Sequence, residues 1–127
     1  ELPSDQRPAY QPDRYGDTWA PLLIAWSLSP QPDIAGHGGP VMIERPDEDV
    51  KTYVSGMVTL DAINPANADR AALRAVMLHE LGHVVGLDHV SDPTQLMAPQ
   101  LSGLRDFAAG DLAGLAQVGD TPCVPLV

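Results

Sequence analysis

Three of the four histidines of this chain stand close together, in the segment HELGHVVGLDH at positions 79–89. On a helix, side chains four residues apart lie one above the other, so His79 and His83 can both reach one ion at the ~2.0–2.1 Å that zinc requires. Gly86 permits the backbone conformation in which a chain leaves a helix, and His89 can then return as a third ligand. The spacing therefore predicts a helix that ends near Gly86 and a metal site with three histidines and an open position for water.

Glu80 follows the first of these histidines directly and can reach the open position without replacing a ligand. Zinc lowers the pKa of bound water toward ~7, and a carboxylate within hydrogen-bond reach can take the proton as the water attacks a carbonyl. We therefore predict His79, His83 and His89 as zinc ligands and Glu80 as the general base. In the competing interpretation the histidines are hydrogen-bonded residues of a buried helix. A short HExxH pattern alone leaves that open, whereas the added glycine and third histidine favour zinc.

Composition limits the fold and the partners. The chain has 127 residues, of which 44% are hydrophobic, and this predicts a single folded domain over residues 1–127. It carries 17 acidic and 7 basic side chains, a net charge of −10, which argues against nucleic acid and anionic membranes as partners because both are bound through clustered Lys and Arg. No apolar run approaches the ~20 residues that span a bilayer. The sequence leaves the oligomeric state open.

The first half of the chain predicts a small sheet. Residues 1–21 are rich in Pro, Asp, Tyr and Arg without hydrophobic periodicity, and we expect an irregular segment. A glycine-rich turn is expected at residues 36–39. Pro40 and Pro46 flank the strand that follows it and favour an edge position. The predicted strands are Leu22–Leu28, Val41–Arg45 and Tyr53–Leu60.

The second half predicts two helices. An Asn/Asp cluster from about Asn67 can cap a helix over residues 71–85, which is apolar almost all round and is expected to be buried. Gly86 ends this helix. A loop containing proline follows, and residues 106–118 predict a shorter helix with Asp111 in the first turn, where the helix dipole favours an anion.

The extended histidine motif resembles that of the metzincin metalloproteases. Metzincins place a methionine turn beneath the metal, and QLMAPQ puts Met97 eight residues after His89, with Pro99 following. That spacing, together with Asp92 and Pro93, is similar to the matrixin branch.

The resemblance continues to the end of the domain. The segment GDLAGLAQVG at residues 110–119 is similar to the C-terminal helix of matrixins, with Asp111 at the position of an acidic residue that braces the methionine turn. The likeness covers roughly residues 22–119. It implies an α+β, zincin-like fold: a mixed, twisted sheet with an antiparallel edge strand, packed on the active-site helix, and a small C-terminal subdomain. In that fold, residues 22–86 form the upper part and residues 87–127 the lower part.

The function that the resemblance implies is a secreted, extracellular zinc endopeptidase with peptide or protein substrates. An extended substrate would pair with the edge strand at Val41, Met42 and Ile43. In matrixins the wall of the pocket after the scissile bond follows the methionine turn. Here that stretch is uncharged, with Leu101 at a position that often carries Tyr, so we expect a preference for a medium-sized apolar residue. The main alternative is a non-catalytic zinc-binding remnant, against which the retention of Glu80 speaks. An acidic interaction module has only the net charge in its favour.

Several residues depart from the matrixin pattern. Val90 stands where matrixins usually carry Ser after the third histidine. His37 is the only remaining histidine, so a second, structural zinc is not expected, and we predict that His37 is a solvated loop residue. The acidic residues Asp47, Glu48 and Asp49 could contribute to a calcium site of the matrixin kind, or could form an ordinary solvated turn.

The largest departure lies at the start of the chain. A matrixin-like domain would have a strand, a long helix and another strand before Leu22, which residues 1–21 are too short to supply. We therefore expect an N-terminally truncated domain from a longer precursor, with an exposed flank that favours self-association. The single cysteine, Cys123, is expected to be either a free thiol or half of a bridge to sequence not present here.

Overall fold

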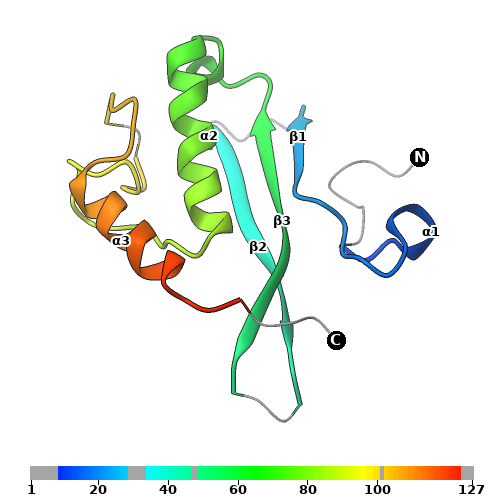
Figure 1. The fold of residues 1–127 in the computed structure, drawn as a ribbon. Helices are drawn as coiled ribbons and strands as arrows, with labels where there is room; N and C mark the ends of the chain where they lie inside the picture. The colour runs from blue at the N-terminus through cyan, green and yellow to red at the C-terminus, as the bar shows by residue number, and fades with distance from the viewer. Residues whose placement is uncertain (1–8, 29–33, 47–48, 101, 124–127) are drawn as a thin grey trace.

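The computed structural model describes residues 9–28, 34–46, 49–100 and 102–123 (Figure 1). A mixed three-stranded sheet has the order β1-β3-β2, in which β1 is parallel and β2 antiparallel to β3. This confirms the predicted α+β class and the antiparallel edge strand. The elements in chain order are α1 (Pro12–Tyr15), β1 (Leu23–Ser27), β2 (Gly36–Glu44), β3 (Lys51–Asp61), the 3-10 helix η2 (Pro65–Asn67), α2 (Arg70–Val84) and α3 (Ala109–Gly119).

The core lies between the sheet and α2. Val58 and Leu60 of β3 pack with Val76 of α2, and all three side chains are essentially removed from solvent. Burying a side chain of this size contributes roughly 1.5–3 kcal/mol, so this cluster fixes the helix that carries the histidines against the sheet. Partly buried hydrophobic residues surround it: Ala35, Leu73, Met77, Leu81 and Val84.

The start of β2 corrects the sequence prediction. Residues 36–39 were expected to form a turn, but they form the first part of β2, and Pro40 lies inside the strand opposite Gly56. The glycines allow β2 to pack closely against α2, since a Cβ at Gly38 would lie 2.7 Å from the backbone oxygen of Glu80. The proline is tolerated because an edge strand leaves one side of its backbone unpaired.

The helix α2 begins and ends within one residue of the predicted bounds. Asp69 is its N-cap and accepts a hydrogen bond from the Ala72 amide at 2.8 Å. Just before it, the Asn67 side chain donates to the carbonyl oxygens of Ala35 and Asp61, at 2.7 and 2.6 Å. The predicted Asn/Asp cluster therefore caps the helix and also connects its start to the beginning of β2 and the end of β3.

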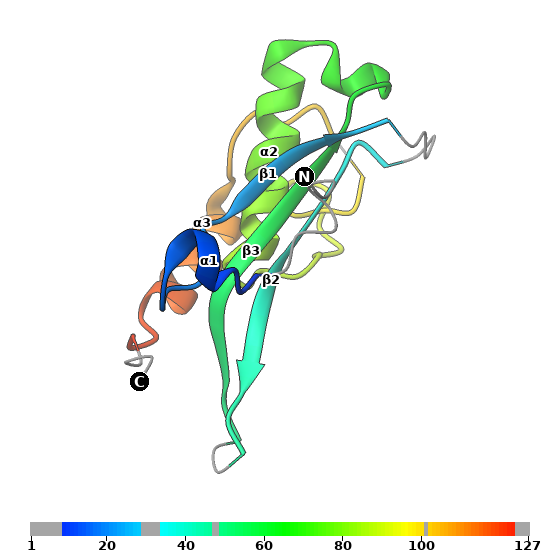
Figure 2. The same cartoon turned by 90° about the vertical axis from the view of Figure 1, so that its right-hand side faces the viewer.

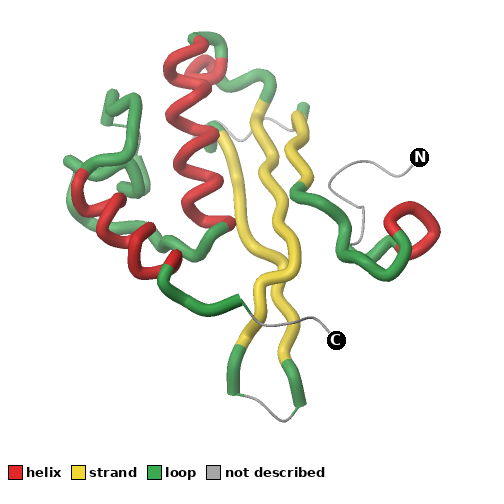
Figure 3. The backbone as a smooth tube through the Cα atoms, viewed as in Figure 1, coloured by secondary structure: helices red, strands yellow, loops and turns green. Residues whose placement is uncertain are grey.

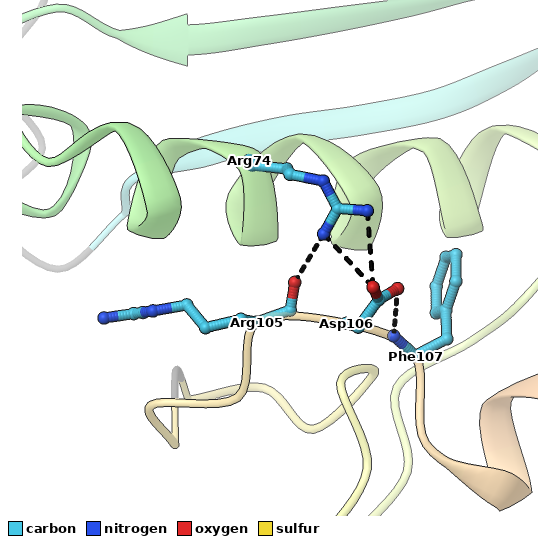
Figure 4. A network of polar contacts seen from close by, with 4 residues as sticks. All are labelled: Arg74, Arg105, Asp106 and Phe107. Carbon is cyan, nitrogen blue, oxygen red and sulfur yellow. Dashed lines mark hydrogen bonds and ion pairs between the residues drawn. The ribbon is translucent and has the colours of Figure 1, made fainter.

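The helix α3 begins at Ala109, three residues later than predicted. Asp106 is instead part of a clamp between the preceding loop and α2 (Figure 4). Arg74 of α2 donates to the Arg105 carbonyl at 2.7 Å and to the Asp106 carboxylate at 3.3 Å, while Asp106 also accepts from the Phe107 amide at 3.0 Å. A side chain that binds its own following amide in this way favours a turn over a helix.

The segment before the sheet is not wholly irregular, because it contains the one-turn helix α1 with Pro12 at its first position. Tyr10 packs against Trp19 in a tilted arrangement, with ring centroids 5.4 Å apart and an interplanar angle of 60°. The segment is attached to the sheet by the Ser55 hydroxyl, which donates to the carbonyl of the buried Ala20 at 2.8 Å.

The edge strand β1 carries a row of exposed apolar side chains. Ile24 and Trp26 of β1 pair with Val58 and Leu60, so their side chains project to the same face as the core. They are nevertheless 47% and 56% exposed, because α2 lies over β2 and β3, with β1 on the far side (Figures 1 and 2). Leu28, directly after the strand, is also exposed.

The β2–β3 hairpin extends past the C-terminal end of α2 (Figure 3). Within the described residues, no helix is both long enough and apolar enough to cross a bilayer.

Candidate metal centre

The three predicted ligands meet at one point. The Nε2 atoms of His79, His83 and His89 form a nearly equilateral triangle, with separations of 3.1, 3.1 and 3.2 Å. Ligands placed tetrahedrally at ~2.0–2.1 Å from an ion stand about 3.3 Å apart. The geometry of the donor atoms therefore fits one zinc ion.

Backbone carbonyls fix which ring nitrogen of two histidines faces the triangle. His79 Nδ1 lies 2.7 Å from the Leu96 carbonyl oxygen, and His83 Nδ1 lies 2.7 Å from that of Leu87. Because a carbonyl only accepts, each Nδ1 carries the hydrogen, and each Nε2 presents its lone pair. Such partners orient metal-binding histidines and set their tautomer.

The surroundings of the triangle disfavour protonation of His79 and His89. Burial lowers the pKa of His79 below its usual value, and the neighbouring imidazoles lower it further. Burial and the charge of His83 also lower the pKa of His89. The ring nitrogens of all three histidines converge on the same position, an arrangement that a divalent cation stabilises.

The turn at the end of α2 explains how His89 returns. Gly86 has a φ of +112°, a conformation that side chains other than glycine rarely adopt. A Cβ there would also lie 3.1 Å from the hydroxyl of Tyr53. The Leu87 amide donates to the Gly82 carbonyl at 2.9 Å, which closes the helix end. The predicted role of Gly86 as the reversal point agrees with this geometry.

Met97 lies beneath the histidines, as the methionine turn predicts. It is 1% exposed, and its sulfur would lie 2.6 Å from a Cβ placed on Gly82, between the two helical histidines. Asp111 of α3 holds this turn, because its carboxylate accepts hydrogen bonds from the amides of Leu96 at 2.7 Å and Met97 at 3.1 Å. Only glycine at position 82 allows the methionine to approach α2 so closely.

Glu80 lies beside the triangle and is 7% exposed. Burial raises the pKa of its carboxyl group above the usual value, while the charges of His83 and His37 and a hydrogen bond from the Gly38 backbone oppose that shift. A carboxylate held in this way accepts a proton more readily than one in water.

The histidines and Glu80 line a cavity of about 1050 Å³, bounded on the other side by the start of β2. Of the predicted substrate-binding residues, Met42 lines this cavity, whereas Val41 and Ile43 are not among the lining residues. Pro99 and Gln100 form part of the wall after the methionine turn. Leu101, predicted for the same wall, lies outside the described residues.

His37 is not a loop residue, contrary to the prediction. It lies on β2, is exposed, and lines the same cavity as the three ligands. The loop prediction was wrong because the surrounding glycines were taken as a turn signal.

Other predicted features fall partly outside the described structure. Asp47 and Glu48 of the possible calcium site are not described, and Asp49 is exposed in a bend. Cys123 is exposed and unpaired among the described residues.

Sequence reasoning missed two groups of residues at the site. Gly36 and Gly38 let β2 approach Glu80, and their spacing on alternate strand positions was the available signal. Gln95 binds the amides at the start of α3. That contact joins segments far apart in the chain, so no local pattern indicates it.

Comparison with known proteins places the chain in one family. The family model described as Matrixin matches residues 23–118. Matrix metalloproteinase-16 from Rattus norvegicus, Homo sapiens and Mus musculus is in each case 56% identical over 36 residues, which cover 28% of this chain and 6% of the relative. No solved structure matches the chain. Because the family model covers most of the chain, including the strands, the histidine motif and the methionine turn, the chain belongs to the matrixin family.

Proposed function

We propose that this chain is a zinc-dependent endopeptidase that hydrolyses peptide bonds in extended protein substrates. One observation carries the proposal: three convergent imidazole nitrogens, 3.1–3.2 Å apart, lie beside a buried glutamate that is not one of them. A purely structural zinc site has no use for this extra carboxylate. Family membership supports the proposal, since matrixins are metalloendopeptidases that use zinc.

The three histidines and Glu80 have separate roles in this proposal. His79, His83 and His89 would hold zinc, which supplies positive charge to acidify water and polarise the scissile carbonyl. Glu80 accepts the proton of the attacking water on its carboxylate and then passes it to the leaving amine. Its raised pKa brings the carboxyl group closer to the working pH, which suits both steps.

The substrate would lie along the outer edge of β2. Among the described strands, β2 pairs only with β3, and its other edge is free for strand addition. Gly36, Gly38 and Gly39 present little side-chain bulk beside the cavity, so a peptide backbone can approach the strand. The small size of these glycines and the uncharged residues Pro99 and Gln100 of the opposite wall support a preference for a medium-sized apolar residue after the scissile bond.

The competing proposal is a zinc-binding remnant without activity, since the relatives match over only a short stretch. The burial of Glu80 against the site favours catalysis. Secretion remains a prediction from the sequence resemblance.

The test is the substitution Glu80→Gln, which keeps the shape of the side chain and removes the base. We expect unchanged zinc content and a loss of peptide-library hydrolysis of about 10²–10⁴-fold. Glu44→Gln, at an exposed position on β2, is the matched control and should keep full activity. Equal activity of Glu80→Gln and the parent would refute the proposed base, and a parent that binds zinc without hydrolysing any peptide would support the remnant.

A further inference from the structure

We propose that Gln95 is a positioning residue of the metal centre, which ties α3 to the methionine turn and so holds the carbonyl that orients His79. This inference rests on the proposed function, because it takes the three histidines as metal ligands.

One end of the Gln95 side chain binds α3. Its Oε1 accepts hydrogen bonds from the backbone amides of Gly110 at 2.7 Å and Asp111 at 3.1 Å. The first amides of a helix have no partner within the helix, and the N-cap residue Ala108 has no side-chain acceptor. Gln95 therefore supplies, from the methionine turn, the acceptor that the helix lacks locally.

The other end of the amide is also fixed. Its Nε2 donates to the Asp92 carboxylate at 3.3 Å and to the Thr94 hydroxyl at 3.1 Å. Asp92 in turn accepts from the amide and hydroxyl of Thr94, at 2.9 and 2.7 Å. These contacts determine which way the amide group of Gln95 points.

The link continues from α3 to the metal. Asp111 of α3 in turn binds the methionine turn, because its carboxylate accepts a hydrogen bond from the Leu96 amide at 2.7 Å. The carbonyl of the same residue, Leu96, accepts from His79 Nδ1 at 2.7 Å. Gln95 and Asp111 thus cross between the same two segments, and the peptide next to Gln95 sets the orientation of a ligand.

Gly110, whose amide binds Gln95, leaves no room for a side chain at this contact. A Cβ at Gly110 would lie 2.7 Å from Gln95 Oε1, closer than nonbonded atoms approach. Gly119, at the other end of α3, has open space around the same position. The two glycines therefore offer a paired test on one helix.

The experiment measures zinc affinity by competition with a chelator and the visible spectrum of the cobalt-substituted protein. Gln95→Met removes the acceptor at similar length, and Gly110→Ala displaces it. Because residues that support ligands typically affect metal affinity by 10–100-fold, we expect both variants to weaken zinc binding about tenfold and to change the cobalt spectrum. Gly119→Ala should do neither.

A rescue separates positioning from general stability. Gln95→Glu combined with Asp92→Asn keeps an acceptor for α3 and a donor–acceptor pair with residue 92, so it should restore zinc affinity and the cobalt spectrum. If Gln95→Met and Gly110→Ala lower the melting temperature but leave affinity and spectrum unchanged, the inference is wrong. Failure of the proposed function looks different, since the parent would then bind zinc but hydrolyse no peptide, while the zinc affinity and cobalt spectrum of the Gln95 and Gly110 variants would still test the inference.

Discussion

The two edges of the sheet differ in what they offer to other molecules. The β2 edge borders the cavity with the histidines and is built from small residues, Gly36, Gly38 and Gly39. The β1 edge carries the exposed side chains of Ile24 and Trp26, which project to the same face as α2. One edge exposes backbone beside the histidine cluster, and the other exposes apolar surface.

The difference follows from the position of α2. The helix packs on β2 and β3, where glycines bring backbone and Glu80 together, and it lies too far from β1 to cover that strand (Figures 1 and 2). The same packing therefore builds the site on one side and leaves an uncovered apolar row on the other. Activity should depend on the β2 edge, and self-association on the β1 edge.

The largest expected effect comes from Gly38→Ala. Its Cβ would lie 2.7 Å from the Glu80 backbone oxygen, so either β2 or α2 must shift. We expect a loss of about 1–3 kcal/mol in the free energy of unfolding, and a fall in peptide hydrolysis of about 10²-fold if the base moves by ~1 Å. Denaturant unfolding and kinetics on one peptide measure both.

The adjacent substitution Gly39→Ala is the control, because its Cβ would meet nothing within 4 Å. It should leave the free energy of unfolding nearly unchanged, so it is a control for the effect of Gly38→Ala on stability. Equal effects at both positions would show that loss of glycine flexibility, rather than the contact with α2, limits this strand.

A smaller effect is expected at the other edge. Trp26→Lys places a charge in the apolar row and should reduce self-association, since exposed apolar patches and open strand edges promote it. Sedimentation velocity over a range of concentrations measures this. Val50→Lys replaces a similarly exposed residue outside the row and should leave association unchanged. The role of β1 is disproved if the two variants behave alike.

The smallest effect concerns the anchor of the segment before β1. Ser55→Ala removes the hydrogen bond to the Ala20 carbonyl, which is 2.8 Å long and partly buried. We expect the free energy of unfolding to fall by about 0.5–1.5 kcal/mol, with no change in zinc content. A loss of zinc in this variant would mean that the two sides of the sheet are coupled, contrary to the comparison.

Local spacing in the sequence was enough to predict that the three histidines converge on one point. His79 and His83 share one helix face, and the glycine at position 86 marks the turn that returns His89, so these positions depend on geometry within eleven residues. The mixed sheet and its edge strand were also predicted, from proline positions and the family resemblance.

Contacts between distant segments could not be predicted in this way. The glycines at 36–39 were taken for a turn because their packing against Glu80 is tertiary. The shorter α3 depends on the contact between Asp106 and Arg74, which lie 32 residues apart. Gln95 has no local pattern that indicates its partners in α3.

The most direct test of the central claim is the zinc content of dialysed protein in three forms. The parent and His37→Ala should each retain about one equivalent, because His37 lines the cavity but is not among the three converging ligands. His83→Ala should lose the metal, since it removes one corner of the triangle. Zinc retained by His83→Ala at the parent level, or lost equally from His37→Ala, would contradict the three-histidine site.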